Sequence, residues 1–210
     1  MKKIIFVLLI FSAFTGMVSA QFFSFGIKGG LNYSKLAFDD TNVTSGSTTY
    51  SLKEDEAFQG FHIGVMTRIK VFNVFVQPEL LFNTSGGKVL IESTSGPAEV
   101  RQIKYNKIDL PVLVGLKLGP LRVNAGPVAS AVLSSDSKLE EIIPGLKSES
   151  KNATIGFQAG VGLDILKMIT MDARYEGGLS RLGDKLTVSG TDYAFDSRSS
   201  KWLISLGFLF

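Results

Sequence analysis

The chain has 210 residues, one histidine, no cysteine and a formal net charge of +3 at pH 7. The absence of cysteine excludes structural disulfides, cysteine-ligated metals and a lipid anchor on an N-terminal cysteine. Basic and acidic residues are nearly balanced, at 22 and 19, and no basic block is interleaved with aromatics. We therefore expect no nucleic-acid partner.

The N-terminal segment has the features of a secretory signal peptide. Lys2 and Lys3 precede an apolar run over residues 4–14. This run is too short to span a membrane. Val18, Ser19 and Ala20, which follow it, have the small residues that are typical of a cleavage site. We predict that residues 1–20 form a cleaved signal peptide and that residues 21–210 form one domain. The alternative is an N-terminal core helix.

Eight segments of the mature chain alternate apolar and polar residues, as strands do when successive side chains point to opposite faces. No later apolar stretch approaches the roughly 20 residues of a membrane helix, so this chain would have to cross a membrane as strands. The predicted strands cover residues 23–33, 61–69, 74–82, 108–118, 121–133, 155–165, 169–179 and 202–210.

The connections between these segments alternate in length. The short ones are residues 70–73, 119–120 and 166–168, and the long polar ones are residues 38–57, 84–100, 134–151 and 181–198. This layout is typical of outer membrane barrels, which have short periplasmic turns and long external loops. We predict an all-β fold, an eight-stranded antiparallel up-and-down transmembrane β-barrel with both termini periplasmic.

One face of each predicted strand is apolar and would meet lipid. The last strand is the clearest case, with Trp202, Ile204, Leu206, Phe208 and Phe210 at every second position. Aromatic residues are expected to form two belts at the membrane boundaries. On the outer face we place Phe23, Phe72, Phe208 and Phe210 near the periplasmic boundary, and Tyr33, Phe61, Phe82, Tyr105 and Trp202 near the external one. The alternative is the core of a β-sandwich.

The opposite face is charged. Eight strands leave an interior only wide enough for side chains, and an unpaired buried charge is strongly destabilising. The charges are therefore predicted to pair and to plug the lumen; a functional charge relay is the alternative. The proposed network is Lys28, Arg68, Glu79, Asp109, Asp172, Arg174 and Glu176, with Lys107, Lys117, Arg122 and Asp164 on the same face. Gly160 is predicted to lie opposite Arg174 and to leave room for its guanidinium.

Evidence for catalysis or metal binding is weak. His62 is the only histidine, and no nucleophile motif accompanies it, although a hydrolytic triad needs a nucleophile, a base and an orienting acid. The acidic residues 39–40 and 54–56 lack the ordered spacing of a calcium loop. We expect no catalytic residue, metal or cofactor. Two alternatives stay open: a lipid-modifying outer membrane enzyme that uses His62, and a soluble ligand-binding barrel, which the polar interior disfavours.

Several short motifs, in this order and spacing, resemble the PorT-type outer membrane β-barrel domain proteins of Gram-negative bacteria. They are residues 26–34, 77–82, 108–111, 126–127, 172–175, 178–179 and 205–210. The resemblance implies an eight-stranded barrel of the OmpA and OmpX type in the outer membrane, with no enzymatic activity. Some members of the family are associated with secretion, a role that does not transfer with the fold.

The resemblance also implies partners. The barrel would contact outer membrane lipid, and the barrel-assembly machinery would recognise the alternating C-terminal residues. We assign this assembly signal to Trp202, Ile204, Leu206, Phe208 and Phe210, with Phe210 as its principal residue. The external loops are expected to contact envelope or surface proteins.

Overall fold

The computed structural model describes most of residues 22–210. The described ranges are residues 22–37, 41–45, 48–54, 57–93, 96–137, 146–150, 153–165, 168–180, 183–188 and 191–210. The predicted signal peptide lies outside them. No helix in these ranges is long and apolar enough to cross a membrane.

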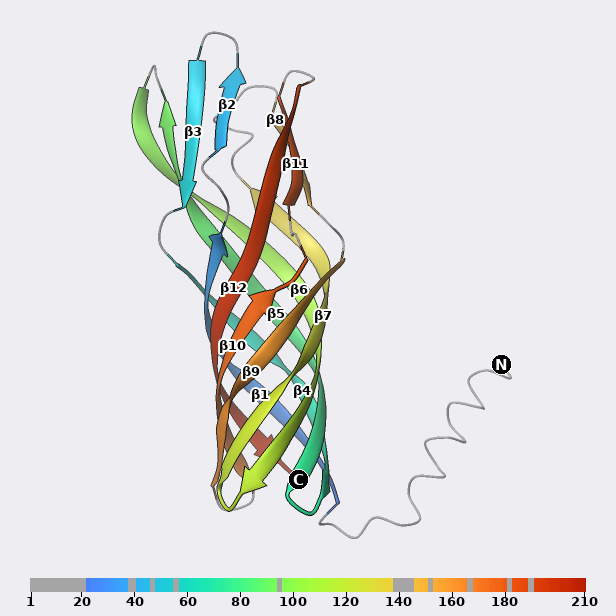
Figure 1. Ribbon diagram of the computed structural model, residues 1–210. Helices are drawn as coiled ribbons and strands as arrows, with labels where there is room; N and C mark the ends of the chain where they lie inside the picture. The colour runs from blue at the N-terminus through green and yellow to red at the C-terminus, as the bar shows by residue number, and fades with distance from the viewer. Residues whose placement is uncertain are drawn as a thin grey trace, which may run out of the picture.

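Eight antiparallel strands form a closed ring (Figure 1). They are β1 (Phe23–Ala37), β4 (Phe58–Val71), β5 (Val74–Ser93), β6 (Gly96–Leu118), β7 (Leu121–Ser137), β9 (Ala153–Ile165), β10 (Ile169–Gly178) and β12 (Thr191–Leu209). Each strand pairs with the next in this order, and β12 pairs with β1, with Trp202 opposite Tyr33. The predicted eight-stranded up-and-down barrel is confirmed.

Tight turns join the strands at the end of the barrel where the C-terminus lies (Figure 1). Phe72 and Asn73 connect β4 to β5, and Gly119 and Pro120 connect β6 to β7. Phe72 and Gly119 both have left-handed backbones, with φ of 55° and 65°. Glycine adopts this conformation freely, whereas a phenylalanine is strained in it.

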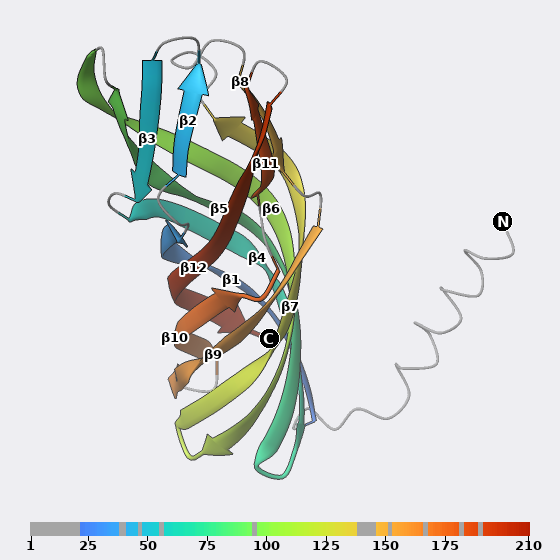
Figure 2. The same ribbon diagram turned by 45° about the horizontal axis from the view of Figure 1, so that its top comes forward.

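At the opposite end, four short strands extend the sheet beyond the barrel (Figures 1 and 2). They are β2 (Thr41–Ser45), β3 (Thr48–Glu54), β8 (Leu146–Ser150) and β11 (Gly183–Val188). The β2–β3 hairpin pairs with β5, whereas β11 pairs with β12 and carries β8 on its other side. We call these two parts the sheet extensions.

The sheet extensions correct the predicted connections. The long segments were expected to be polar loops, but they contain these four strands. The correction is largest for residues 84–100, where β5 continues to Ser93 and β6 begins at Gly96. The two strands pair continuously there, for example Lys88 with Gln102. Backbone pairing with a neighbouring strand forms these elements.

The two faces of the barrel wall differ as predicted. On β12 the side chains of Trp202, Ile204 and Leu206 are exposed on the outer face, while Leu203 and Ser205 between them are buried. The register across the β6–β7 turn, with Lys117 opposite Arg122, keeps inward residues opposite inward residues. Because a slip of one residue would reverse every side chain, this register fixes which residues fill the lumen.

Tyr105 is the exception to the predicted aromatic belts. It was expected on the outer face, but its side chain is buried, because it shares the inward face of β6 with Lys107 and Asp109. Beyond the apolar outer band it belongs to a buried group with Val89, Ile91 and Ile103. Burial raises the pKa of the Tyr105 hydroxyl to about 12.

Candidate functional site

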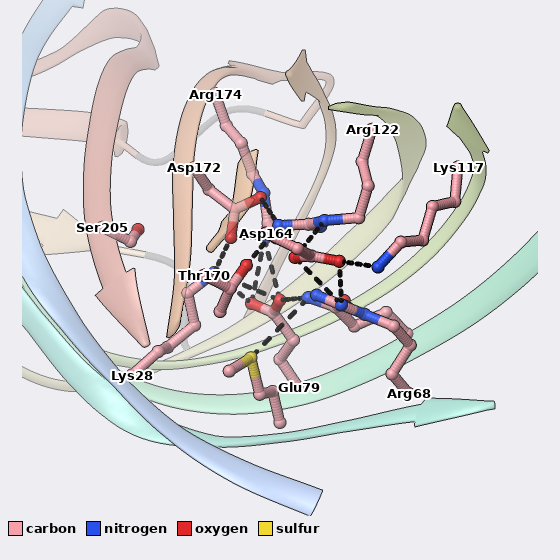
Figure 3. Close-up of polar contacts among 12 residues, drawn as sticks. Lys28, Arg68, Glu79, Lys117, Arg122, Asp164, Thr170, Asp172, Arg174 and Ser205 are labelled. Carbon is pink, nitrogen blue, oxygen red and sulfur yellow. Dashed lines mark hydrogen bonds and ion pairs between the residues drawn. The ribbon is translucent and has the colours of Figure 1, made fainter. Parts of the chain in front are cut away.

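The barrel interior holds two groups of polar side chains. The one nearer the tight turns, which we call the turn cluster, is drawn in Figure 3. Its side chains point from several strands into the middle of the barrel. Its members are Lys28, Arg68, Gln77, Glu79, Lys117, Arg122, Asp164, Thr170, Asp172 and Arg174.

Asp164 on β9 interacts with cations from three other strands. Its carboxylate lies 3.1 Å from Arg68 Nη1 on β4 and accepts a hydrogen bond of 2.7 Å from Arg122 Nε on β7. It also accepts a hydrogen bond from Lys117 on β6. One carboxylate thus links strands that are not neighbours in the ring.

Glu79 and Asp172 bind the remaining cations of the turn cluster. Glu79 accepts hydrogen bonds from Arg174 Nη1 at 2.9 Å, Lys28 Nζ at 3.2 Å and Gln77 Nε2 at 2.5 Å. Asp172 lies 3.4 Å from Lys28 Nζ and 3.2 Å from Arg122 Nη2. Through Glu79 and Arg174 the turn cluster reaches across the lumen from β5 to β10.

Phe75 supports two of the guanidinium groups. The Cζ atoms of Arg68 and Arg122 lie 5.4 and 5.8 Å from its ring centroid, within cation–π range. Gly115 lies opposite Phe75 on the neighbouring strand, and a side chain at Gly115 would collide with the ring. An aromatic ring and its stacked cations therefore help to close the lumen near the turns.

A second group, the extension cluster, lies nearer the sheet extensions. Lys201 Nζ is 2.9 Å from both Asp109 and Glu176. Asn83 donates to Asp109 at 2.5 Å, and Gln158 donates to Glu176 at 2.7 Å. The sequence prediction missed Lys201 because it began the last strand at Trp202. The alternation itself would have placed Lys201 inside the barrel, one position before that outward residue.

The structure places the predicted network residues in both clusters. Lys28, Arg68, Glu79, Asp172 and Arg174 lie in the turn cluster. Asp109 and Glu176 lie in the extension cluster, where Lys201 joins them. The five residues assigned to the assembly signal lie on the outer face of β12, with Phe210 just beyond its end.

His62 lies inside the barrel with a serine beside it. Its Nε2 is 2.8 Å from Ser205 Oγ, and both side chains are buried. Its Nδ1 has no hydrogen-bond partner among the described residues, so they provide no orienting acid for a triad. This pair is enclosed in the lumen, away from the outer face, where a lipid substrate would be. In the same ranges no group of three or more His, Asp or Glu residues could hold a metal.

A closed barrel with an apolar outer face and a charged, paired interior defines an integral membrane β-barrel. Residues 19–183 match the family model described as an outer membrane protein beta-barrel domain. The chain belongs to this outer membrane protein family, and the membrane is the outer membrane of a Gram-negative bacterium. This assignment replaces the soluble barrel that the sequence had left open.

Solved outer membrane proteins have similar structures. OprG of Pseudomonas aeruginosa has a TM-score of 0.50 at 11% sequence identity, over 89% of this chain and 95% of OprG. Neisserial surface protein A has a TM-score of 0.49 at 13% identity, over 89% and 97% of the two chains. Ail of Yersinia pestis has a TM-score of 0.44 at 12% identity, over 90% and 99%. At sequence identities this low, structural similarity concerns the fold alone. No curated protein matches the chain.

Proposed function

We propose that this protein is a non-enzymatic outer membrane barrel with a plugged lumen, whose sheet extensions contact envelope or surface proteins. One observation carries the proposal: buried ion pairs join strands on opposite sides of the ring, Arg174 on β10 to Glu79 on β5 and Arg68 on β4 to Asp164 on β9. Eight strands enclose little more than side chains, so these pairs occupy the space that a water-filled pore would need.

The proposal includes an orientation. The tight turns and both ends of the mature chain would face the periplasm, and the sheet extensions would face outward, as short turns and long loops do in outer membrane barrels. The exposed apolar side chains of Phe72 and Phe210 at the turn end suit the boundary of the inner leaflet. The sheet extensions are then the part of the chain available to partners outside the cell.

We also infer that the chain is a member of the PorT-type group, because its short motifs, from residues 26–34 to residues 205–210, resemble those of that group. Some members of that group are associated with secretion. In this chain such a role would have to act through the sheet extensions or the turns, because a plugged lumen provides no path for a secreted protein.

Planar bilayer recordings test the plugged lumen. Purified wild-type protein should insert without adding conductance steps. Insertion is checked independently by protection of the barrel from protease. Steady ohmic steps from correctly folded protein would overturn the proposal.

Cross-linking in intact cells tests the role of the sheet extensions. A photoreactive residue at Val100, which is exposed on the end of β6 that lies beside the β2–β3 sheet extension, should give a discrete protein adduct. The same probe at Leu206 on the outer face of the barrel should give none, because lipid surrounds it. Identical labelling at both positions would contradict a contact surface on the extension.

A further inference from the structure

The buried charges of the lumen do not balance. Among the described residues, six buried cations face five buried carboxylates. The cations are Lys28, Arg68, Lys107, Arg122, Arg174 and Lys201, and the carboxylates are Glu79, Asp109, Asp164, Asp172 and Glu176. Lys117, a quarter exposed and paired with Asp164, is a further cation of the lumen. At least one positive charge is therefore left over in a space of low dielectric, where uncompensated charge is strongly unfavourable.

Among the described residues, Lys107 is the buried cation that forms no direct ion pair. The other five buried cations each form at least one ion pair. Lys107 is only 2% exposed, and it forms no ion pair with any residue that the structure describes. The carboxylates of its own cluster, Asp109 and Glu176, are both held by Lys201. Excess charge of the lumen is therefore located at this ammonium group.

A small cavity lies beside Lys107. It has a volume of about 10 Å³, which suits a single water-sized occupant. Three hydroxyl-bearing residues line it: Ser130 on β7, Thr154 on β9 and Ser180 just beyond β10. The Ser180 hydroxyl already bonds the backbone of Ile155, and the Ser130 hydroxyl bonds Asp109, which leaves the Thr154 hydroxyl. Gly156 and Gly178 also line it and have no side chain to fill it. The cavity thus combines an unpaired cation, one potential hydroxyl donor and space for one small occupant.

We propose that this cavity is a binding site for one small monovalent anion, for which chloride is the probe. Such an ion would accept hydrogen bonds from Lys107 Nζ and the Thr154 hydroxyl, and it would compensate the positive charge of Lys107. Glu176 also lines the cavity. Its two oxygens are already engaged by Lys201 and Gln158, which offsets its charge. Larger anions such as gluconate do not fit the space.

The test compares chloride with gluconate at equal ionic strength, using the purified full-length barrel in detergent. We expect chloride to raise the midpoint of thermal unfolding saturably, by about 2–4 °C, because it binds only the folded state. Lys107→Met should abolish this shift. Lys104→Met, which changes an exposed lysine on the same strand, should keep it. Thr154→Val should weaken the chloride-dependent shift of the unfolding midpoint. This variant tests the site if Lys107→Met fails to fold.

Crystals grown in bromide give a second readout. An anomalous peak within hydrogen-bond distance of Lys107 Nζ is the expected result. The proposal is overturned if ordinary water alone fills the cavity, if gluconate stabilises as well as chloride, or if the shift persists in Lys107→Met.

Discussion

Gly160 on β9 lies directly opposite Arg174 on β10. A Cβ atom at Gly160 would lie 2.3 Å from the backbone oxygen of Ala173 and 2.7 Å from both Cα and Cγ of Arg174, closer than such atoms approach in folded proteins. The missing side chain therefore gives Arg174 the space in which it turns inward and reaches Glu79. The opposing pair was predicted from the sequence, and the register confirms it.

The first prediction follows from this close approach. Gly160→Ala should lower the free energy of unfolding by about 1–3 kcal/mol, as overpacking does in a filled interior. The shift of heated samples on gels measures the unfolding midpoint. Gly29→Ala is the matched control, because its Cβ would have 3.5 Å to the nearest atom, His62 O. Equal losses in both variants would show that the space beside Arg174 is not the cause.

The second prediction concerns Glu79, which holds both Lys28 and Arg174. Glu79→Gln should lower stability by about 3–5 kcal/mol, because it leaves buried cations uncompensated, while membrane insertion should persist. Chemical unfolding of the folded barrel measures the loss. A Glu79→Gln, Arg174→Met double variant should lose less than the sum of the single variants, because the two side chains interact.

The control for Glu79 is an exposed ion pair. Glu99 and Arg101 are 2.8 Å apart, with side chains 46% and 35% exposed. Glu99→Gln should change stability by at most about 1 kcal/mol. If Glu79→Gln were as mild as this control, the turn cluster would not stabilise the barrel.

The third prediction uses the strained turn between β4 and β5. Phe72 has a φ of 55° and is 89% exposed, so it loses few protein contacts when replaced. Phe72→Gly should raise stability in detergent by about 1 kcal/mol, because glycine adopts the left-handed region without strain. Gly119→Ala, at a φ of 65°, should act in the opposite direction. A destabilised Phe72→Gly variant would mean that the ring is held by contacts stronger than the strain.

The fourth prediction tests the assembly signal. Phe210→Ala should reduce the amount of barrel assembled in cells, while the purified chain still refolds in detergent. Phe25→Ala is the matched control, because the Phe25 and Phe210 rings are 5.8 Å apart and this variant loses the same contact but keeps the terminal aromatic. Membrane fractions are compared by immunoblot. Equal defects in cells would assign the effect to ring packing and not to recognition.

The barrel could be predicted from the sequence because successive residues of each strand face lipid and lumen in turn, and the two environments require different side chains. A face in hydrocarbon tolerates almost no charge, so Ile204 and Leu206 contrast sharply with Ser205 between them. This contrast sets the strand, its register and the side on which each charge lies. It placed Lys28, Glu79 and Asp172 inside the barrel without any knowledge of their partners.

Alternation no longer predicts strands in the parts of the chain that have no contact with lipid. Beyond the barrel both faces of a strand meet water or other chain segments, so β2 and β11 show no strong alternation and were expected to be loops. Tyr105 and Lys201 lie near this limit, where an aromatic no longer signals a membrane boundary and a strand continues past its last apolar residue. The unpaired state of Lys107 depends on distances between side chains, which a sequence pattern does not contain.

The ion pairs of the turn cluster also constrain the order of folding. Lys28 and Asp172, 144 positions apart, meet only when the first and last strands have come together. An open sheet in the bilayer would expose these charges and its unpaired strand edges to hydrocarbon, at a high energetic cost. Closure of the seam between β1 and β12 therefore removes both costs together, because it pairs the strand edges and brings Lys28 to Asp172.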